Sequence, residues 1–432
     1  QPTAVVLRQD GSTQHALCPT CCTFMEFRHV QPHTAPCYEG AQACAANVNN
    51  SDSSTFAFVA TLWASAPEQP AGSASSCDQA GLSAELLSRY CLDALVLGHS
   101  FQRVESCYGR VLMCTSEALD LARSMGWLEL LHMVGWRTLQ IEPVKVADIL
   151  ISKCRKKFCG CFAKLRALAL HGYTRVALMD LDMVVRQNVD CLADPSQFPA
   201  PMAAARVNWR NRELQPGEQM YSRDFFDNEG KQRYGVNAGL VILETSEAEL
   251  GKMLESLQDG RDRSHVVSSG PEQGFLTRWP GYMDRWQHLD IRFNYQLHQL
   301  DFVQPGFKAD RRKDLPYDEV CICHFSAEPK PSDFFFQSQK TYDQFDDFVT
   351  GSLVKDGGQG WVRETLMRAS REWYDVFLSA WELVAKEAAP GVHLGTFERL
   401  VRPGPDDLKV FLSKISAGHG RRVVNPNEQA GA

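Results

Sequence analysis

The sequence predicts an α/β protein with a mixed, mostly parallel β-sheet and a helical C-terminal extension. Short apolar runs rich in β-branched and aromatic residues alternate with longer segments of helical spacing, which is typical of α/β domains. A long loop rich in Ser, Ala, Gly and Pro follows the first such run. Near the end of the chain, the segment 360–389 keeps helical apolar spacing for about eight turns. These observations favour one large α/β domain followed by helix.

The expected elements follow from these patterns in chain order. Strands are expected at 56–63 (FAFVATLW), 109–116 (GRVLMCTS), 137–144 (RTLQIEPV), 174–182 (TRVALMDLD), 234–244 (YGVNAGLVILE) and 319–325 (EVCICHF). Helices are expected at 89–104 (RYCLDALVLGHSFQRV), 117–136 (EALDLARSMGWLELLHMVGW), 159–170 (CGCFAKLRALAL) and from 272 (EQGFLTRW). We expect three regions: an irregular Cys-rich segment 1–54, the α/β domain 55–340, and a helical extension 341–432 with a mobile tail.

Composition excludes some classes of protein. The chain has 432 residues, is 44% hydrophobic and 22% charged, and carries a net charge of −7, so a general nucleic-acid-binding role is not expected. No apolar run approaches the roughly 18 residues that a transmembrane helix needs. The chain begins with Gln1, so a processed product or a fragment is expected, and a removed signal peptide stays open. Oligomeric state is not predicted.

The fifteen cysteines fall into two groups. Several, such as Cys114 and Cys323, sit in apolar runs and are expected to be free buried thiols. A second group lies in the turn-rich N-terminal segment and comprises Cys18, Cys21, Cys22, Cys37 and Cys44, with His29 and His33 forming C-x2-C-x7-H-x3-H. Zinc ligands, disulfides and reduced thiols all stay open for this group, as do a cytoplasmic and a lumenal location.

Two aspartates interrupt an apolar run at the end of an expected core strand. Asp180 and Asp182 follow RVALM, and in extended chain residues i and i+2 point to the same side. Ligands of open parallel sheets bind at the carboxyl ends of the strands. Two carboxylates there suit Mg²⁺ or Mn²⁺, although D-x-D alone also fits a loop cap beside a solvated side chain.

The order of further motifs makes the pattern more specific. TRVALMDLDMVV, NAGLVIL, EQGFL, RFNYQ and CHFSAEPKP follow one another along the chain. This ordered set resembles the family 8 retaining glycosyltransferases, the glycogenin-like enzymes, over residues 56–333. The resemblance implies a GT-A fold, in which one Rossmann-like domain binds a nucleotide sugar, usually a UDP-sugar, with Mn²⁺; Mg²⁺ is the other candidate. It implies transfer of a hexosyl group to the hydroxyl of a carbohydrate or another acceptor.

The resemblance also implies roles for individual residues. Metal ligands would be Asp180, Asp182 and His324. Groups around the nucleotide sugar would be Thr61, Leu62, Tyr90, Arg155, Lys164, Leu181, Ala238, Gly239, Asn294, Ala327 and Lys330. Residues at the reacting centre would be Asn237, Glu272 and Gln273. Acceptor specificity is expected in the loops 65–88 and 206–234. The aromatic stripe of the C-terminal helix (Trp361, Trp373, Trp381) is expected to pack on the main domain rather than to stack on carbohydrate.

Three positions depart from the family pattern. Glu272 stands where glycogenin-like enzymes have aspartate, Ala327 replaces a glycine of the HF-x-G-x-x-KPW motif, and Ser332 replaces its tryptophan. These departures leave open a non-catalytic protein of the same fold that binds a nucleotide sugar or carbohydrate. A nucleotidyltransferase is disfavoured, because the first loop contains neither G-x-G nor a lysine to hold a triphosphate.

Overall fold

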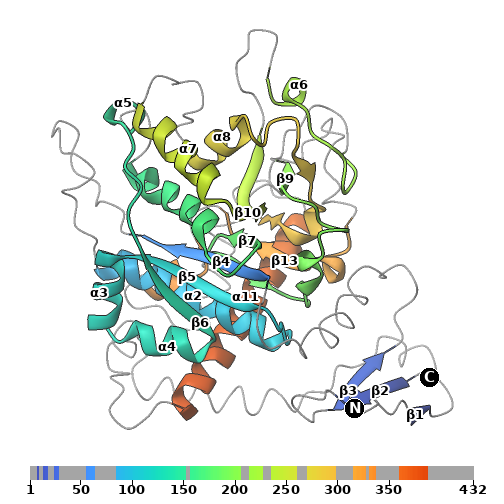
Figure 1. Cartoon of the computed structure of the whole chain (residues 1–432). Coiled ribbons are helices and arrows are strands. Elements are labelled where there is room, and N and C mark those ends of the chain that lie inside the picture. The colour runs from blue at the N-terminus through green and yellow to red at the C-terminus, as the bar shows by residue number, and fades with distance from the viewer. Residues whose placement is uncertain are drawn as a thin grey trace, which may run out of the picture.

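The computed structural model of the chain forms an α/β domain with helices on both sides of a central sheet (Figure 1). The α/β class that the sequence predicts is therefore confirmed. The structure describes residues 7–8, 13–17, 24–28, 55–63, 84–151, 156–205, 214–226, 235–259, 270–297, 315–326, 330–336 and 360–387. None of the helices in these ranges combines the length and hydrophobicity that crossing a bilayer requires.

The central sheet contains most of the expected strands. Its order is β11 (Gln287–His288), β9 (Met202–Ala205), β10 (Val236–Glu244), β7 (Arg175–Met179), β4 (Phe56–Leu62), β5 (Gly109–Thr115) and β6 (Trp136–Ile141). β10 pairs antiparallel with both β7 and β9, and every other pairing in this sheet is parallel. The sheet is thus mixed and mostly parallel, as predicted.

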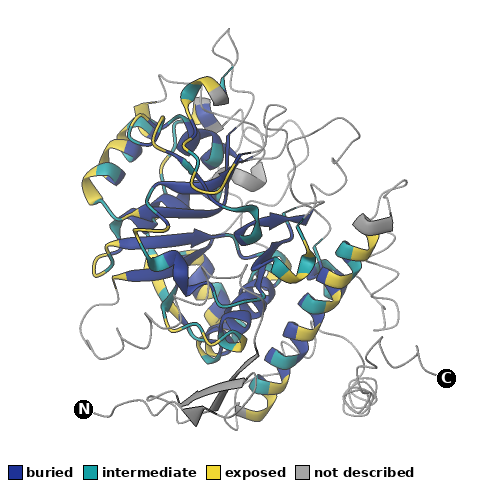
Figure 2. Cartoon of the chain, turned by 90° about the vertical axis from the view of Figure 1, so that its right-hand side faces the viewer, coloured by how far each residue is buried: buried dark blue, intermediate teal, exposed yellow. Residues whose placement is uncertain are grey.

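The central strand β4 shows why these runs are apolar throughout. Phe56, Phe58 and Leu62 project into the core on one face, and Ala57 and Val59 project into the core on the other face. Because both faces are covered by helices, successive side chains are all buried. Figure 2 shows the sheet in the dark blue of buried residues, while the exposed residues lie mainly on the outer sides of helices and on loops.

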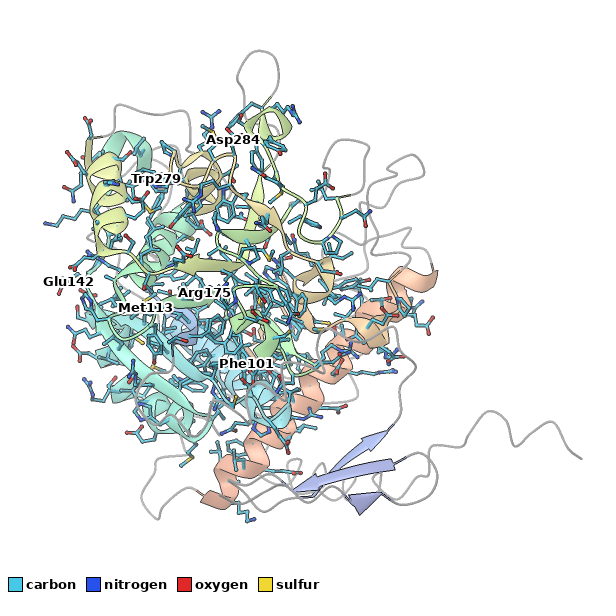
Figure 3. The ribbon with its side chains drawn as sticks, turned by 45° about the vertical axis from the view of Figure 1, so that its right-hand side comes forward. Phe101, Met113, Glu142, Arg175, Trp279 and Asp284 are labelled. Atoms are coloured by element: carbon cyan, nitrogen blue, oxygen red, sulfur yellow. The ribbon has the colours of Figure 1, made fainter. Side chains whose placement is uncertain are left out.

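The helices divide between the two faces of the sheet. One face is covered by α2 (Ala84–Arg103), α3 (Ser116–Ser124), α4 (Trp127–Met133) and α11 (Gly360–Glu387); the other by the helical segment Lys156–Ala169, α7 (Glu247–Asp259) and α8 (Pro271–Arg278). Figure 3 shows Phe101 on the α2 side of the molecule and Trp279 on the α8 side. The short helices are α5 (Asp148–Ile151), α6 (Ser222–Phe225) and α9 (Asp333–Phe336).

Two expectations about secondary structure need correction. The single helix expected over 117–136 is broken, because Gly126 has a left-handed φ of 75° that ends α3 and precedes α4. The N-terminal segment, expected to be irregular, contains three short antiparallel strands, β1 (Leu7–Arg8), β2 (Thr13–Leu17) and β3 (Phe24–Arg28). The cysteines and histidines of the C-x2-C-x7-H-x3-H pattern lie outside the described residues.

The C-terminal helix α11 packs on the domain as its apolar spacing predicts. Trp373 is 1% exposed and Trp381 is 6% exposed, which confirms the packing role for these two aromatic side chains; the side chain of Trp361 lies outside the described part. Arg186 Nε lies 2.6 Å from Glu372 Oε2, and the hydroxyl of Tyr317 donates to the same oxygen at 2.8 Å. These contacts attach α11 to the chain next to β8 (Met183–Val185).

A second, smaller sheet continues the chain beyond the end of β7. It has the order β12 (Tyr295–Gln296), β13 (Ile322–His324), β8, with β13 parallel to β12 and antiparallel to β8. Cys323 of β13 is a buried free thiol, as is Cys114 of β5, and both outcomes confirm the prediction. The segment between β7 and β8 therefore connects the two sheets, and it contains the two aspartates.

Candidate metal centre

Three potential metal ligands converge between the two sheets. Asp180, Asp182 and His324 each offer one ligand atom, and these atoms lie within 4.8 Å of one another. His324 is only 2% exposed, whereas both aspartates are partly exposed. Within the described residues this is the one cluster of His, Cys, Asp and Glu side chains that could hold a metal ion.

Backbone pairing brings the three residues together. β7 ends at Met179, and the amide of Asp180 donates to Gly239 O of β10 at 2.8 Å. Asp182 O accepts from the amide of Phe325 at 2.8 Å, which places it beside the end of β13. The expected strand 174–182 is thus shorter than predicted, and Asp180–Asp182 is a turn between two sheets.

Each aspartate divides its two oxygens between a lysine and the histidine. Asp180 Oδ1 pairs with Lys164 Nζ, and Asp182 Oδ2 pairs with Lys330 Nζ. The other oxygens, Asp180 Oδ2 and Asp182 Oδ1, both lie 3.5 Å from His324 Nε2. Each lysine therefore pairs with a different aspartate, and the second oxygen of each carboxylate lies near the same imidazole nitrogen.

The charges of this cluster are mutually stabilised. Burial disfavours ionisation of Asp182, but Lys330 and His324 beside it outweigh that effect and hold its pKa well below the usual range. Burial likewise lowers the pKa of Lys164, but Asp180 and Glu272 outweigh it and raise that pKa above its ordinary value. Burial also lowers the pKa of Lys330, but the carboxylate of Asp182 outweighs this effect and raises that pKa above its ordinary value.

The donor set fits a divalent cation. Two carboxylate oxygens and one imidazole nitrogen are a mixed set that suits Mn²⁺ better than Mg²⁺, because Mg²⁺ prefers oxygen ligands. A histidine that binds a metal is neutral, so Asp180, Asp182 and Glu272 then outnumber the positive charges of Lys164 and Lys330. A cation between the carboxylates would offset this excess of negative charge.

The first turn of α8 brings an acidic group to the cluster. Gly270 has a left-handed φ of 80° and Pro271 is the first helical residue, so Glu272 lies at the helix N-terminus. Lys164 Nζ donates to Glu272 Oε1 at 3.2 Å, while Glu272 Oε2 is buried and has no nitrogen or oxygen partner among the described residues; the buried thiol of Cys161 lies beside this carboxylate. Gln273 Oε1 accepts from the amide of Ala238 at 3.0 Å, so this residue braces β10.

Asn237 and Asn294 lie behind the histidine rather than on its open side. Asn237 is 7% exposed, and Asn294 and Gln296 are fully buried. Asn294 Oδ1 lies 2.8 Å from His324 Nδ1, and Asn294 Nδ2 donates to Asn237 Oδ1 at 2.9 Å. The structure therefore places both asparagines in a hydrogen-bonded chain that ends at His324.

An aromatic pair lies at the carboxyl end of β4. The ring centroids of Trp63 and Tyr90 are 6.2 Å apart, and Lys164 Nζ lies 5.9 Å from the centre of the Trp63 ring. Leu62, in contrast, is fully buried in the core, and Thr61 is 2% exposed. Trp63, the residue that follows the expected contacts Thr61 and Leu62, is therefore more exposed than either of them.

Not every predicted residue turns its side chain to the site. Leu181 lies between Asp180 and Asp182, but its side chain is packed in the core that faces α2 and α11, with 9% of the residue exposed. Arg155 and Ala327 lie outside the described residues, as do most of the loops 65–88 and 206–234. Their predicted roles stay predictions.

Three residues near the site were not predicted from the sequence. Trp63 directly follows the observed strand β4, Gln296 is two residues after Asn294, and Asp93 interrupts the apolar face of α2. Asp93 is 2% exposed, and burial raises its pKa well above the ordinary value although Lys330 partly opposes this. An acidic residue inside the run CLDALVLG was the available signal for Asp93.

Comparison with known proteins adds sequence relatives. No protein-family model matches the chain. Its sequence is 26% identical over 269 residues to the uncharacterised protein R707 of Acanthamoeba polyphaga mimivirus. This alignment covers 59% of this chain and 86% of R707. The chain is similar to a human glycogenin. The identity to human glycogenin-2 is 23% over 286 residues, covering 65% of this chain and 46% of glycogenin-2. This match agrees with the resemblance to family 8 glycosyltransferases and supports a glycosyltransferase.

Solved structures of glycosyltransferases are also similar to the chain. The galactosyltransferase LgtC, solved with donor and acceptor sugar analogues, matches with a TM-score of 0.43 and 12% identity over 79% of this chain and 99% of LgtC. GlyE of Streptococcus pneumoniae TIGR4 matches with a TM-score of 0.40 and 15% identity over 77% of this chain and 64% of GlyE. Because these TM-scores are low, the fold is described by the strand order given above and not by these similarities.

Proposed function

We propose that the protein is a metal-dependent retaining glycosyltransferase that moves a hexosyl group from a UDP-sugar to a hydroxyl acceptor. The observation that supports this most strongly is the convergence of Asp180, Asp182 and His324 at one point between two lysines. The sequence similarity to glycogenin-2 supports the same class of enzyme. Mn²⁺ is the expected ion and Mg²⁺ the other candidate.

The chain's own charges suit a diphosphate beside the metal. When bound, the ion would supply Lewis-acid stabilisation of the charge that develops on the leaving nucleotide. Lys330 Nζ already donates to Asp182 and to Phe325 O at 2.9 Å, which leaves one further N–H for a phosphate oxygen. We assign Lys330 and Lys164 to the diphosphate, because each carries its positive charge directly beside an aspartate of the triad.

Glu272 is the residue that we assign to the reacting sugar. Its Oε1 is held by Lys164, and its Oε2 is buried with no nitrogen or oxygen partner in the described part of the chain. A buried oxygen without a partner is costly, so it suits a ligand group that arrives with the substrate. In this proposal Oε2 stabilises positive charge on the sugar or holds the acceptor hydroxyl, and the anomeric configuration is retained.

Turnover of UDP-sugars tests the proposed function. The purified protein would be incubated with a panel of UDP-sugars, with Mn²⁺ or with EDTA, and free UDP would be measured. We expect UDP release from one sugar with Mn²⁺ and none with EDTA. UDP binding without release from any sugar, across a panel of sugar and peptide acceptors, would contradict catalysis and favour a nucleotide-sugar-binding protein of the same fold.

The aromatic pair gives a binding readout that does not depend on turnover. We expect UDP with Mn²⁺ to quench tryptophan fluorescence, and Trp63→Phe to remove most of the quench, because Trp63 lies between Tyr90 and Lys164 at the edge of the site. Trp381→Phe, in α11 and buried in the core far along the chain from the site residues, is the control and should keep the quench. An unchanged quench in Trp63→Phe would place the base elsewhere.

A further inference from the structure

The imidazole of His324 is held from behind by an amide. Its ring is 2% exposed, with Nε2 directed at the two aspartates and Nδ1 at Asn294 Oδ1, 2.8 Å away. A histidine can offer Nε2 to a metal only if that nitrogen is unprotonated. Which nitrogen carries the proton is therefore decisive for the proposed metal site.

The orientation of each amide in the chain behind His324 is set by a backbone group. The amide N–H of Gly239 can only donate, so the atom of Asn237 that lies 2.9 Å from it must be the oxygen, Oδ1. That same oxygen lies 2.9 Å from the side chain of Asn294, which must therefore present its NH₂ group. The remaining atom of the Asn294 amide is its oxygen, and this oxygen faces His324.

The hydrogen bond between Asn237 and Gln296 agrees with this assignment. Asn237 Nδ2 donates to Gln296 Oε1 at 2.9 Å, so Asn237 uses both ends of its amide in one consistent direction. Asn294 and Gln296 are fully buried, and buried amides without partners are costly. Asn237 and Asn294 are both buried, so neither amide can flip without losing a hydrogen bond away from water. The orientation that Gly239 fixes for Asn237 therefore also fixes the orientation of the Asn294 amide.

We propose that Asn294 is a positioning residue that keeps the proton of His324 on Nδ1 and directs the Nε2 lone pair at the metal. An amide oxygen can only accept, so Nδ1 must be the donor, and Nε2 is left as the ligand atom facing Asp180 and Asp182. Asn237 and Gln296 act through Asn294 in the same chain. This inference rests on the proposed metal-dependent function, and it assigns Asn237 to the metal side rather than to the donor sugar.

Two substitutions at one position separate this role from simple packing. Asn294→Leu keeps the branched side-chain shape with a larger volume and has no acceptor for Nδ1–H, whereas Asn294→Asp keeps that acceptor, replaces the donor to Asn237 with a second acceptor and adds a negative charge. Binding of Mn²⁺ alone would be measured by the electron paramagnetic resonance signal of the free ion. We expect affinity to fall about 10- to 100-fold in Asn294→Leu and to stay within about threefold of wild type in Asn294→Asp.

Asn188→Leu is a matched control, because Asn188 accepts from the amide of Asp190 away from the triad and should keep Mn²⁺ affinity. Equal losses of Mn²⁺ affinity in Asn294→Leu and Asn294→Asp, or wild-type affinity in Asn294→Leu, would overturn the proposal.

If a variant fails to fold, the ¹⁵N chemical shifts of His324 in the wild-type protein, assigned by comparison with His324→Gln, still test the proposal. A protonated Nδ1 is expected, and an Nε2–H tautomer would overturn the proposal. Mn²⁺ binding with the expected tautomer but no UDP-sugar turnover would refute the proposed function alone.

Discussion

Asp182→Ala is expected to abolish Mn²⁺-dependent binding of UDP while leaving the fold intact. The substitution removes the Oδ1 atom that faces His324 Nε2 and the Oδ2 atom that pairs with Lys330. It removes no backbone contact, since Phe325 bonds to the carbonyl of residue 182. We expect a loss in Mn²⁺ affinity on the order of 100-fold or more and turnover near background. Calorimetric titration of UDP with and without Mn²⁺ would measure it.

A surface aspartate provides the control for this variant. Asp120 of α3 pairs with Arg123 at 2.7 Å on the exposed helix face, an interaction of little energetic value. Asp120→Ala should therefore bind UDP like the wild type. Wild-type UDP affinity and metal dependence in a folded Asp182→Ala variant would show that this carboxylate is not a metal ligand.

Gly239→Ala is expected to destroy the same site by a steric route. A Cβ atom at residue 239 would overlap Cε1 of His324 and would lie 2.7 Å from its Nδ1 and 2.8 Å from Asn237 Oδ1. The imidazole is buried and hydrogen-bonded to Asn294, so any shift that relieves the overlap disturbs its position relative to Asp180 and Asp182. We expect the free energy of unfolding to fall by about 1–3 kcal/mol and Mn²⁺ affinity to fall on the order of 100-fold.

Gly251→Ala in α7 is the opposite case and serves as the control. Gly251 is an exposed interior residue of the helix, and no atom lies within 4 Å of its added Cβ. Alanine there should raise the free energy of unfolding by about 0.5–1 kcal/mol and leave Mn²⁺ affinity unchanged. Thermal unfolding and Mn²⁺ titration of both variants would test this; equal Mn²⁺ affinity in the two would mean that His324 is not held as described.

Much of the fold could be predicted because it depends on local patterns. Apolar runs identified the strands of the central sheet, and helical spacing identified α11 from the sequence. The break between α3 and α4 was missed because Gly126 lies within continuous apolar spacing, and only its left-handed backbone ends the helix. The predicted domain boundaries and the predicted roles of the site residues stay predictions.

The candidate site could be predicted only where a motif marks it. Asp180, Asp182 and His324 were found from ordered motifs, and the structure brings them within reach of one ion. The partners of Asn294 could not be found in this way, because hydrogen bonds between residues 237, 294 and 324 depend on the pairing of separate strands. Trp63 was missed as a site residue because the expected base contacts stopped at Leu62, whose side chain is in the core.

The most direct test of the central claim is a crystal structure with UDP and Mn²⁺, recorded at the manganese absorption edge. We predict one anomalous peak bound by Asp180 Oδ2, Asp182 Oδ1 and His324 Nε2, with the diphosphate beside Lys330. A manganese ion bound elsewhere, or a nucleotide bound without metal at this triad, would contradict the account.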